Sequence, residues 1–220
     1  MVKTADLFDF SHSLAGEYLK GFEYPWDALA GIKELIIKLG ATLGDDFNEV
    51  SESVWIHKSA KVASTASISA PCIIGAETEV RHCAFIRGSA LIGEGCVIGN
   101  SVEVKNAIIF DGVQVPHFNY VGDSILGYKS HMGAGSVTSN VRSDKALVVI
   151  HDRVNGEDIE TGRKKVGAML GDFVEVGCNS VLNPGTIIGR NSIVYPTSCT
   201  RGVIPAESIY KNNGTIAAKK

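Results

Sequence analysis

A repeat of six residues runs through most of this 220-residue chain and limits what the chain can fold into. Aliphatic or large apolar residues recur at every sixth position from Ile56 to Phe110, return at Leu126 and Met132, and resume from Leu170 to Val194. A helix needs an apolar period near 3.6 residues and a half-buried strand needs a period of 2, so neither alone explains a sustained period of six. The period predicts a solenoid in which each hexad supplies one short strand and one turn, and three hexads complete a coil.

A second, mostly small residue follows each of the early apolar positions by four. We expect the apolar residue to point inward and stack on its counterparts in adjacent coils, and the small one to sit near a corner. Each coil then contacts mainly its neighbours, and the core is a column. The small positions are Ala60, Ala66, Cys72, Thr78, Ala84, Ala90, Cys96 and Val102.

These hexads resemble those of the hexapeptide-repeat transferases, whose coils form a left-handed parallel β-helix. The left hand is implied by this resemblance, because the general rule for parallel strands favours right-handed connections. The resemblance also implies trimers, in which the exposed strand edges and flat faces close against sister columns. The predicted fold is all-β: a left-handed parallel β-helix with a short N-terminal helical segment and a protruding β-hairpin.

The residues before the repeat predict a helix that begins at Pro25 and ends at Gly40. Its apolar side chains lie on one face, which must pack against the open end or the side of the column, or against another subunit. The polar, acidic residues 41–53 predict a linker. We therefore expect an N-terminal cap and linker at 1–53, the β-helix at 54–205 and a polar C-terminal tail at 206–220.

Two interruptions of the repeat predict departures from a regular column. Pro116 and Gly122 occupy places that an aliphatic residue would hold, which predicts a bulged or extruded loop there. The second interruption, about 137–169, contains the apolar run Leu147–Ile150 followed by Asn155-Gly156. Asn-Gly between two apolar runs is a strong hairpin signal, so we expect a β-hairpin arm that projects from the column.

The composition is that of an ordinary globular protein, with 45% hydrophobic and 20% charged residues. A net charge of −3 gives no reason to expect nucleic acid or an anionic membrane as a partner. The chain has no apolar signal-peptide core and no apolar run near the roughly 20 residues of a membrane helix, so we expect a cytoplasmic protein. The five cysteines show no CxxC spacing, which argues against a zinc knuckle or a redox pair.

Two motifs carry most of the functional information. Residues 116–123 read Pro-His-Phe-Asn-Tyr-Val-Gly-Asp, and residues 133–140 read Gly-Ala-Gly-Ser-Val-Thr-Ser-Asn. This pair is similar to motifs in the acetyltransferase domain of the bifunctional bacterial and archaeal enzymes that make UDP-N-acetylglucosamine. Pro25-Trp26-Asp27 and the stretch 162–168 look like the archaeal members, and the resemblance covers about residues 25–205. It implies acetyl transfer from acetyl-CoA to the amino group of a sugar phosphate such as glucosamine-1-phosphate.

The residue that matches the family's general base is His117. An ammonium group must lose a proton before it attacks a thioester, and histidine titrates near neutral pH. Arg87 and Lys105 lie one coil apart on the same outward edge, where two cations suit a phosphate or carboxylate. By the same resemblance, the predicted substrate contacts are Arg87, Lys105, Tyr120, Asn140 and Lys145, and the predicted cofactor contacts are Ala134 and Cys178.

The chain also departs from the family's pattern. No Gly-rich phosphate-binding loop stands near the N-terminus, so we expect no synthesis of UDP-sugars by this chain alone. His131 stands where an asparagine is common, and Asn140 is not followed by the bacterial Tyr-Asp-Gly. Zinc carbonic anhydrases share the solenoid, but their pair of histidines five residues apart is missing, so we predict no metal. A non-catalytic sugar-phosphate-binding or assembly module remains an alternative.

Overall fold

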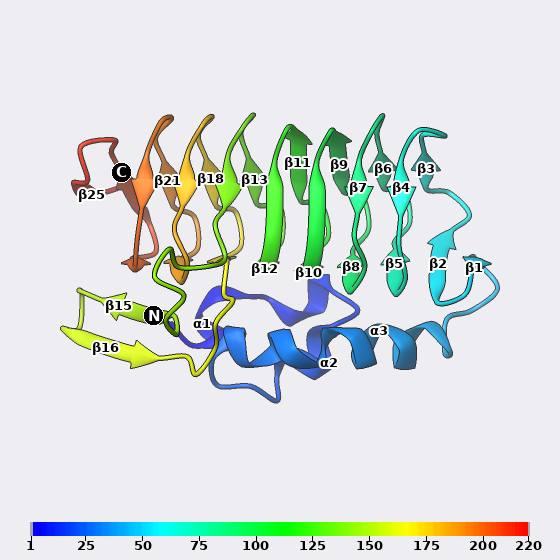
Figure 1. Cartoon of the computed structure of the whole chain (residues 1–220), viewed down its shortest axis with the longest axis horizontal. Helices are drawn as coiled ribbons and strands as arrows, with labels where there is room; N and C mark the ends of the chain where they lie inside the picture. The colour runs from blue at the N-terminus through cyan, green and yellow to red at the C-terminus, as the bar shows by residue number, and fades with distance from the viewer. Residues whose placement is uncertain (1, 220) are drawn as a thin grey trace.

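The computed structural model describes residues 2–219, which form a parallel β-helix of about 9 turns with helices along one side (Figure 1). Neighbouring coils pair in parallel; Cys72, for example, pairs with Ala90, three hexads later. The predicted fold class, a left-handed β-helix of hexapeptide repeats, is confirmed. In the described part of the chain, no helix is long and apolar enough to cross a membrane.

Each coil has three faces. In chain order these are the covered face, against which the N-terminal helices pack, the second face and the third face. The second face is the nine-stranded sheet: β3 (Lys61–Val62), β6 (Glu79–Val80), β9 (Val97–Asn100), β11 (Gln114–His117), β13 (His131–Met132), β18 (Glu175–Val176), β21 (Ile193–Val194), β24 (Ser208–Tyr210) and β25 (Ile216–Ala218). The covered face contains β1 (Phe47–Ser51), β2 (Val54–His57), β5 (Cys72–Ile74), β8 (Ala90–Ile92), β17 (Ala168–Leu170), β20 (Thr186–Ile188) and β23 (Val203–Ile204). The third face contains β4 (Ser67–Ile68), β7 (Phe85–Ile86), β14 (Val137–Thr138), β19 (Val181–Leu182) and β22 (Cys199–Thr200).

Two longer strands, β10 (Glu103–Ile109) and β12 (Tyr120–Leu126), bend round a corner and join the covered and third faces into one 14-stranded sheet. Glu103 pairs with Phe85 of the third face, whereas Ala107 pairs with Ala90 of the covered face. The bends fall at Asn106 and Asp123, whose φ angles are 48° and 49°. These two corner residues belong to the polar cluster described below.

The hexad register slips by one residue at Asn106. Ile109, not Phe110, pairs with Ile92, so the uninterrupted repeat expected as far as Phe110 is wrong at its last position. Phe110 is nevertheless completely buried, because its ring packs 5.1 Å from the ring of Phe8 in the N-terminal segment. The slip makes this coil one residue shorter, and the parallel pairing of the β-helix continues through it.

The extruded loop expected near Pro116 and Gly122 is also absent. After the slip, Val115 and Val121 take the inward positions, and each pairs with an inward aliphatic residue of the preceding coil. Both valines are fully buried. The column therefore continues through this stretch without a bulge, and the candidate site residues there lie on regular coils.

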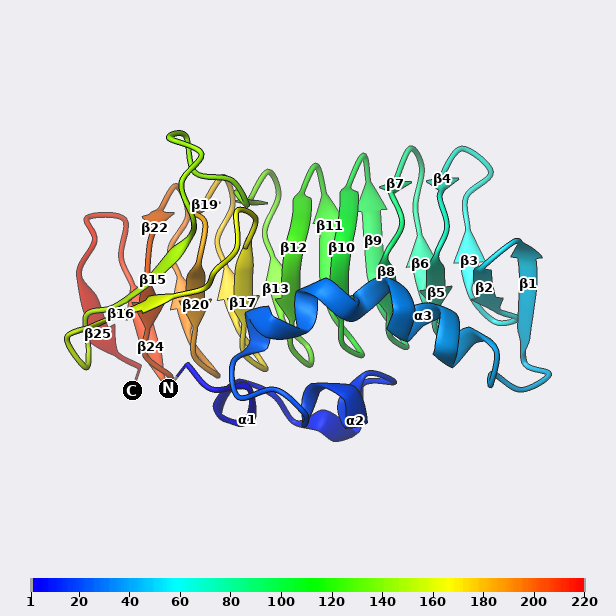
Figure 2. The ribbon, with the colours of Figure 1, turned by 60° about the horizontal axis from the view of Figure 1, so that its bottom comes forward.

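The covered face carries apolar residues on both of its sides, because its strands contain two successive apolar residues of which one points inward and one outward. The helical segment comprises α1 (Thr4–Leu7), η1 (Phe10–His12), α2 (Gly16–Leu19), η2 (Pro25–Gly31) and α3 (Ile32–Gly40). The last helix lies along the side of the column against β5, β8 and β10 (Figure 2). The outward residues, all buried, are Ile73, Leu91, Ile108, Ile125, Met169, Ile187 and Val203.

A buried carboxylate holds the start of the chain to the column. Asp172, 1% exposed, accepts the backbone N–H groups of Asp9 and Tyr128 at 2.7 and 2.9 Å and pairs with Arg190. Because these partners satisfy the carboxylate, its burial is tolerated. The N-terminal segment is thus part of the fold, held by a polar anchor as well as by apolar packing.

The predicted hairpin consists of β15 (Val149–Asp152) and β16 (Glu157–Glu160), an antiparallel pair that leaves the column after β14 and returns before β17. Its base lies against the C-terminal coils, where Val148 and Ile150 are buried and approach Gly185. Two of the predicted irregular segments contain strands: β1 lies within the expected linker 41–53, and β24 and β25 lie within the expected tail 206–220.

Candidate active site

The two sequence motifs lie in adjacent coils, and Asn119 connects them. Its side chain is 3% exposed; Nδ2 donates to the carbonyl oxygens of Gly133 and Ser136 at 2.8 and 3.0 Å, and Oδ1 accepts the backbone N–H of His117 at 3.1 Å. The N–H of Gly135 donates to the carbonyl of His117 at 3.0 Å. The first motif's turn is thereby fixed directly against the second. Sequence reasoning missed Asn119, although it stands inside the quoted motif.

His117, Ala134 and Cys178 occupy equivalent positions in three successive coils, at the corner between the second and third faces. The carbonyl oxygen of His117 accepts the N–H of Gly135, the residue after Ala134. In the same way, the carbonyl oxygen of Ala134 accepts the N–H of Asn179, the residue after Cys178, at 2.8 Å. Successive coils lie about 4.8 Å apart, so the three positions form a line along the column axis. The imidazole of His117 is exposed and makes no hydrogen bond or ion pair within residues 2–219.

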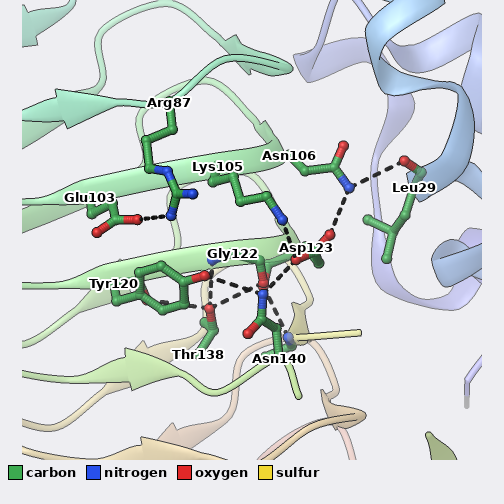
Figure 3. A network of polar contacts seen from close by, with 12 residues as sticks. Leu29, Arg87, Glu103, Lys105, Asn106, Tyr120, Gly122, Asp123, Thr138 and Asn140 are labelled. Atoms are coloured by element: carbon green, nitrogen blue, oxygen red, sulfur yellow. Dashed lines mark hydrogen bonds and ion pairs between the residues drawn. The ribbon is translucent and has the colours of Figure 1, made fainter. Parts of the chain in front are cut away.

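A polar cluster lies at the opposite edge of the third face, centred on Asp123 (Figure 3). This carboxylate is 5% exposed and accepts from Lys105 Nζ at 3.2 Å, Asn106 Nδ2 at 2.9 Å and Asn140 Nδ2 at 2.5 Å. One cation and two amides compensate the buried negative charge. The structure thus brings together two predicted substrate residues, Lys105 and Asn140, through an aspartate that sequence reasoning left without a role.

Tyr120 joins this cluster through Asn140, whose Nδ2 lies 3.1 Å from the phenolic oxygen. Burial, together with the negative charges of Asp123 and Glu103, raises the pKa of Tyr120, so its phenol stays protonated at neutral pH. Gly122 leaves room for this ring: a Cβ atom there would lie 2.3 Å from the tyrosine oxygen. This contact explains why a glycine follows the tyrosine by two residues, because a larger residue at position 122 would displace the ring.

Arg87 lies on the third face one coil before Lys105 and binds a different carboxylate. Its Nη1 donates to Glu103 Oε1 at 2.6 Å, and the guanidinium lies 6.0 Å from the ring centroid of Phe85. Lys105, although close to Glu103 in the sequence, binds Asp123 instead. The two predicted phosphate-binding cations therefore each have an acidic partner.

Lys145 lies apart from the cluster, exposed on the loop that leaves the column. Its backbone N–H donates to the carbonyl of Arg142 at 3.1 Å, and its side chain makes no hydrogen bond or ion pair among the described residues. The basic residues beside the cluster are instead those of the segment that follows β16 and returns to the column. They line a cleft of about 320 Å³, and Asn106 Nδ2 also donates to the carbonyl of Leu29 at its edge, at 3.3 Å. The lining residues are Leu29, Ala30, Asn106, Asp123, Gly162, Arg163, Lys164 and Lys165.

Residues 2–219 contain no group of three or more His, Cys, Asp or Glu side chains arranged to hold a metal ion. His131 lies on the second face, where its Nδ1 is 2.8 Å from Glu175 Oε2 of the next coil. The candidate site therefore has three parts. These are His117, whose imidazole has no partner among the described residues, the line of Ala134 and Cys178 along the same corner, and the polar cluster around Asp123 at the opposite edge of the third face. Such a site suits proton transfer and recognition of a polar ligand.

The fold and the two motifs define a hexapeptide-repeat β-helix protein. The family model described as the GMPPB C-terminal domain matches residues 69–167. The chain is 31% identical over 208 residues to the bifunctional protein GlmU of Methanococcus maripaludis, which covers 92% of this chain and 50% of that protein. It is 38% identical over 92 residues to a bifunctional sugar-1-phosphate nucleotidylyltransferase/acetyltransferase of Sulfurisphaera tokodaii, covering 42% of this chain and 22% of that protein.

The predicted resemblance to these bifunctional proteins is confirmed, and the chain spans about half the length of the curated relatives that match it along most of its length. Among solved structures, the chain is similar to PerB from Caulobacter crescentus in complex with CoA and GDP-perosamine, with 18% identity, 74% of this chain and 56% of that chain covered, and a TM-score of 0.40.

Proposed function

We propose that the chain is an acetyl-CoA-dependent N-acetyltransferase that acts on an amino-sugar phosphate such as glucosamine-1-phosphate. The observation that carries the proposal is the unpartnered His117, fixed by Asn119 against the Gly133–Ser136 turn. The similarity to bifunctional GlmU proteins over 92% of the chain supports the reaction class. The proposal includes a cytoplasmic homotrimer with the reaction groove between two subunits.

The reaction is a direct transfer. His117 accepts a proton from the sugar ammonium, and the neutral amine attacks the carbonyl carbon of the thioester. Once His117 has released this first proton to solvent, it takes the second proton from the nitrogen of the tetrahedral intermediate and passes it to the CoA sulfur as the carbon–sulfur bond breaks. The product is an N-acetyl sugar and free CoA, with no covalent enzyme intermediate.

The oxyanion donor in this mechanism is the backbone N–H of Ala134. In the Gly133–Ser136 turn, the other three N–H groups donate to the carbonyl oxygens of Val176, His117 and Gly133, whereas that of Ala134 has no acceptor within residues 2–219. A fixed, unused donor beside the base is what a developing negative charge requires. The line of His117, Ala134 and Cys178 then directs the cofactor from the base toward the C-terminal coils.

The acceptor is placed by the polar cluster and the cleft beside it. Tyr120 and Asn140 offer hydrogen bonds to sugar hydroxyls, and Lys105 carries a positive charge at the same edge. Lys164 and Lys165 at the cleft supply two cations with no ion-pair partner among the described residues, which suits a phosphate. In this arrangement Lys165, rather than Lys145, binds the phosphate.

Replacement of Lys165 by glutamine is expected to raise the KM for the sugar phosphate about tenfold or more, because a charge-assisted hydrogen bond is lost. The KM for acetyl-CoA should stay unchanged. Lys145→Gln tests the residue that the resemblance selected, and Lys38→Gln on the outer surface of α3 serves as the charge-matched control. A larger increase in KM for Lys145→Gln than for Lys165→Gln would contradict the proposed placement of the phosphate.

The proposal is tested by thiol release from acetyl-CoA with glucosamine-1-phosphate, glucosamine-6-phosphate and UDP-glucosamine as acceptors. Turnover with a phosphorylated amino sugar, and N-acetyl product detected by mass spectrometry, are expected. Binding of these sugars by calorimetry, without any turnover, would instead support the non-catalytic sugar-phosphate-binding module. Neither turnover nor binding would refute both functions.

A further inference from the structure

A second cavity, of about 290 Å³, lies on the third face over the C-terminal coils. The two ends of the insertion pair with each other and separate this cavity from the cleft described above. Val141 forms a β-bridge with Lys165, and the N–H of Val166 donates to the carbonyl of Asn140 at 3.0 Å. The residues that line this cavity are Ser139, Val141, Arg142, Ser143, Asp144, Val149, Asn183, Pro184 and Arg201.

The cavity lies in line with Lys105 along the axis of the β-helix. The strand register places Ser139, Asn183 and Arg201 in equivalent positions of three successive coils, since Val137 pairs with Val181 and Val181 pairs with Cys199. In the preceding coils the same position is Gly122, and before it Lys105. At about 4.8 Å per coil, the cavity therefore begins one coil beyond the tyrosine that covers Gly122.

The charges of the lining favour an anion. Arg142 donates to Asp144 through Nε at 2.9 Å and Nη2 at 2.6 Å, and these bonds lower the pKa of Asp144, so the acid stays ionised and neutralised. Arg201 has no hydrogen bond or ion pair in the described part of the chain, and it adds one uncompensated positive charge. The Nη1 of Arg142 is also unused, so two guanidinium groups are available to one ligand.

Polar groups around the arginines favour a ligand that carries hydroxyl groups as well as a phosphate. Asn183 Nδ2 donates to the carbonyl of Thr200 at 2.8 Å and to Cys199 Sγ at 3.1 Å, which leaves its Oδ1 as an acceptor. The hydroxyls of Ser139 and Ser143 make no hydrogen bond to protein within residues 2–219 and add donors and acceptors. A phosphorylated sugar ring presents the matching chemistry.

We propose that this cavity is a second phosphate subsite, in which Arg201 and Arg142 bind a phosphorylated ribose or sugar at the end of a long substrate. The inference rests on the proposed function and goes beyond it, because a simple amino-sugar phosphate has only one phosphate. Two molecules carry the required group: CoA, through its phosphorylated ribose, and a nucleotide-linked amino sugar, through its diphosphate and ribose.

The test is calorimetric binding of four probes, CoA, 3′-dephospho-CoA, UDP-glucosamine and inorganic pyrophosphate, to the full chain and to Arg201→Gln. Arg153→Gln, in the exposed turn of the hairpin, removes the same charge outside the cavity. Arg201→Lys keeps the charge but loses the fork of donors, and it should weaken binding less than the glutamine. Thermal unfolding of each variant checks that the fold is kept.

We expect Arg201→Gln to weaken one organic probe at least tenfold, and Arg153→Gln to weaken none. A loss for CoA but not for dephospho-CoA assigns the subsite to the cofactor, and a loss for UDP-glucosamine alone assigns it to the acceptor. Equal binding of all probes by the wild type and both glutamine variants overturns the proposal, as does a wild type that binds none of them. Binding is measured here without turnover. If the protein shows no acetyl transfer but Arg201→Gln still weakens binding of an organic probe, the proposed transferase function is refuted and the proposed subsite is retained.

Discussion

Turnover with an amino-sugar phosphate is expected to fall at least a hundredfold when His117 is replaced by alanine. A positioned general base contributes about 10²–10⁴ to the rate of a proton-coupled attack, and no other described imidazole belongs to the two motifs. The side chain of His117 is exposed and bonds to no described residue, so its removal should leave folding intact. The measurement is kcat/KM for thiol release, together with the thermal unfolding midpoint.

His82 provides the matched control for this prediction. It occupies the same corner two coils before His117, since the register places His82 opposite Asn100 and Asn100 opposite His117. Its Nδ1 already contacts the hydroxyl of Thr65 at 2.7 Å, and it lies outside both motifs. His82→Ala should keep the wild-type rate, and added imidazole should partly restore His117→Ala. A loss below about threefold for His117→Ala would remove this histidine from the mechanism.

The column was predictable from sequence because its interior repeats. Each inward aliphatic residue meets the same neighbours one coil above and one coil below, so a single period describes most of the core. The covered face also had a readable signal that the sequence analysis did not use. Successive apolar pairs such as Ile73-Ile74, Leu91-Ile92 and Ile108-Ile109 recur once per coil, and strands apolar on both sides are covered on both sides.

The slip at Asn106 was hidden by a coincidence of side-chain type. Phe110 keeps the six-residue period apolar, so the sequence offers no break at the bend. The ring is buried for another reason, because Phe8 packs on it from the N-terminal segment, about a hundred residues earlier. A contact of this kind depends on how the segment crosses the column, which no local pattern encodes.

The candidate site likewise contains residues that a local sequence pattern selects and residues whose role depends on contacts between distant segments. His117 and Ala134 belong to contiguous motifs, and a local pattern suffices to select them. The role of Asp123 depends on Lys105, Asn106 and Asn140, which meet only after the coils stack. Lys165 reaches the cleft because the insertion returns beside its own exit, and the sequence does not show where an inserted hairpin re-enters the column.

Loss of the buried contact of α3 is expected to have the largest effect on stability. Ile36 is fully buried on this helix, which packs against β5, β8 and β10, whereas its neighbour Ile37 is 43% exposed. Replacing Ile36 with alanine removes apolar contacts and leaves a cavity, at a cost of about 2–5 kcal/mol in the free energy of unfolding. Denaturant-induced unfolding followed by tryptophan fluorescence reports this change, because Trp26 lies in the same covering segment and is 1% exposed.

Ile37→Ala is the control, since it deletes the same atoms from the same helix at an exposed position and should cost within about 0.5 kcal/mol. A covering segment that loosens also exposes the outward apolar residues of the covered face, so the Ile36 variant should bind a hydrophobic dye more strongly than the Ile37 variant. It should also weaken binding at the proposed acceptor site, because Asn106 bonds both Asp123 and the carbonyl of Leu29 in this segment. Equal stability and equal dye binding in the two variants would mean that the column holds its covered face without the helix.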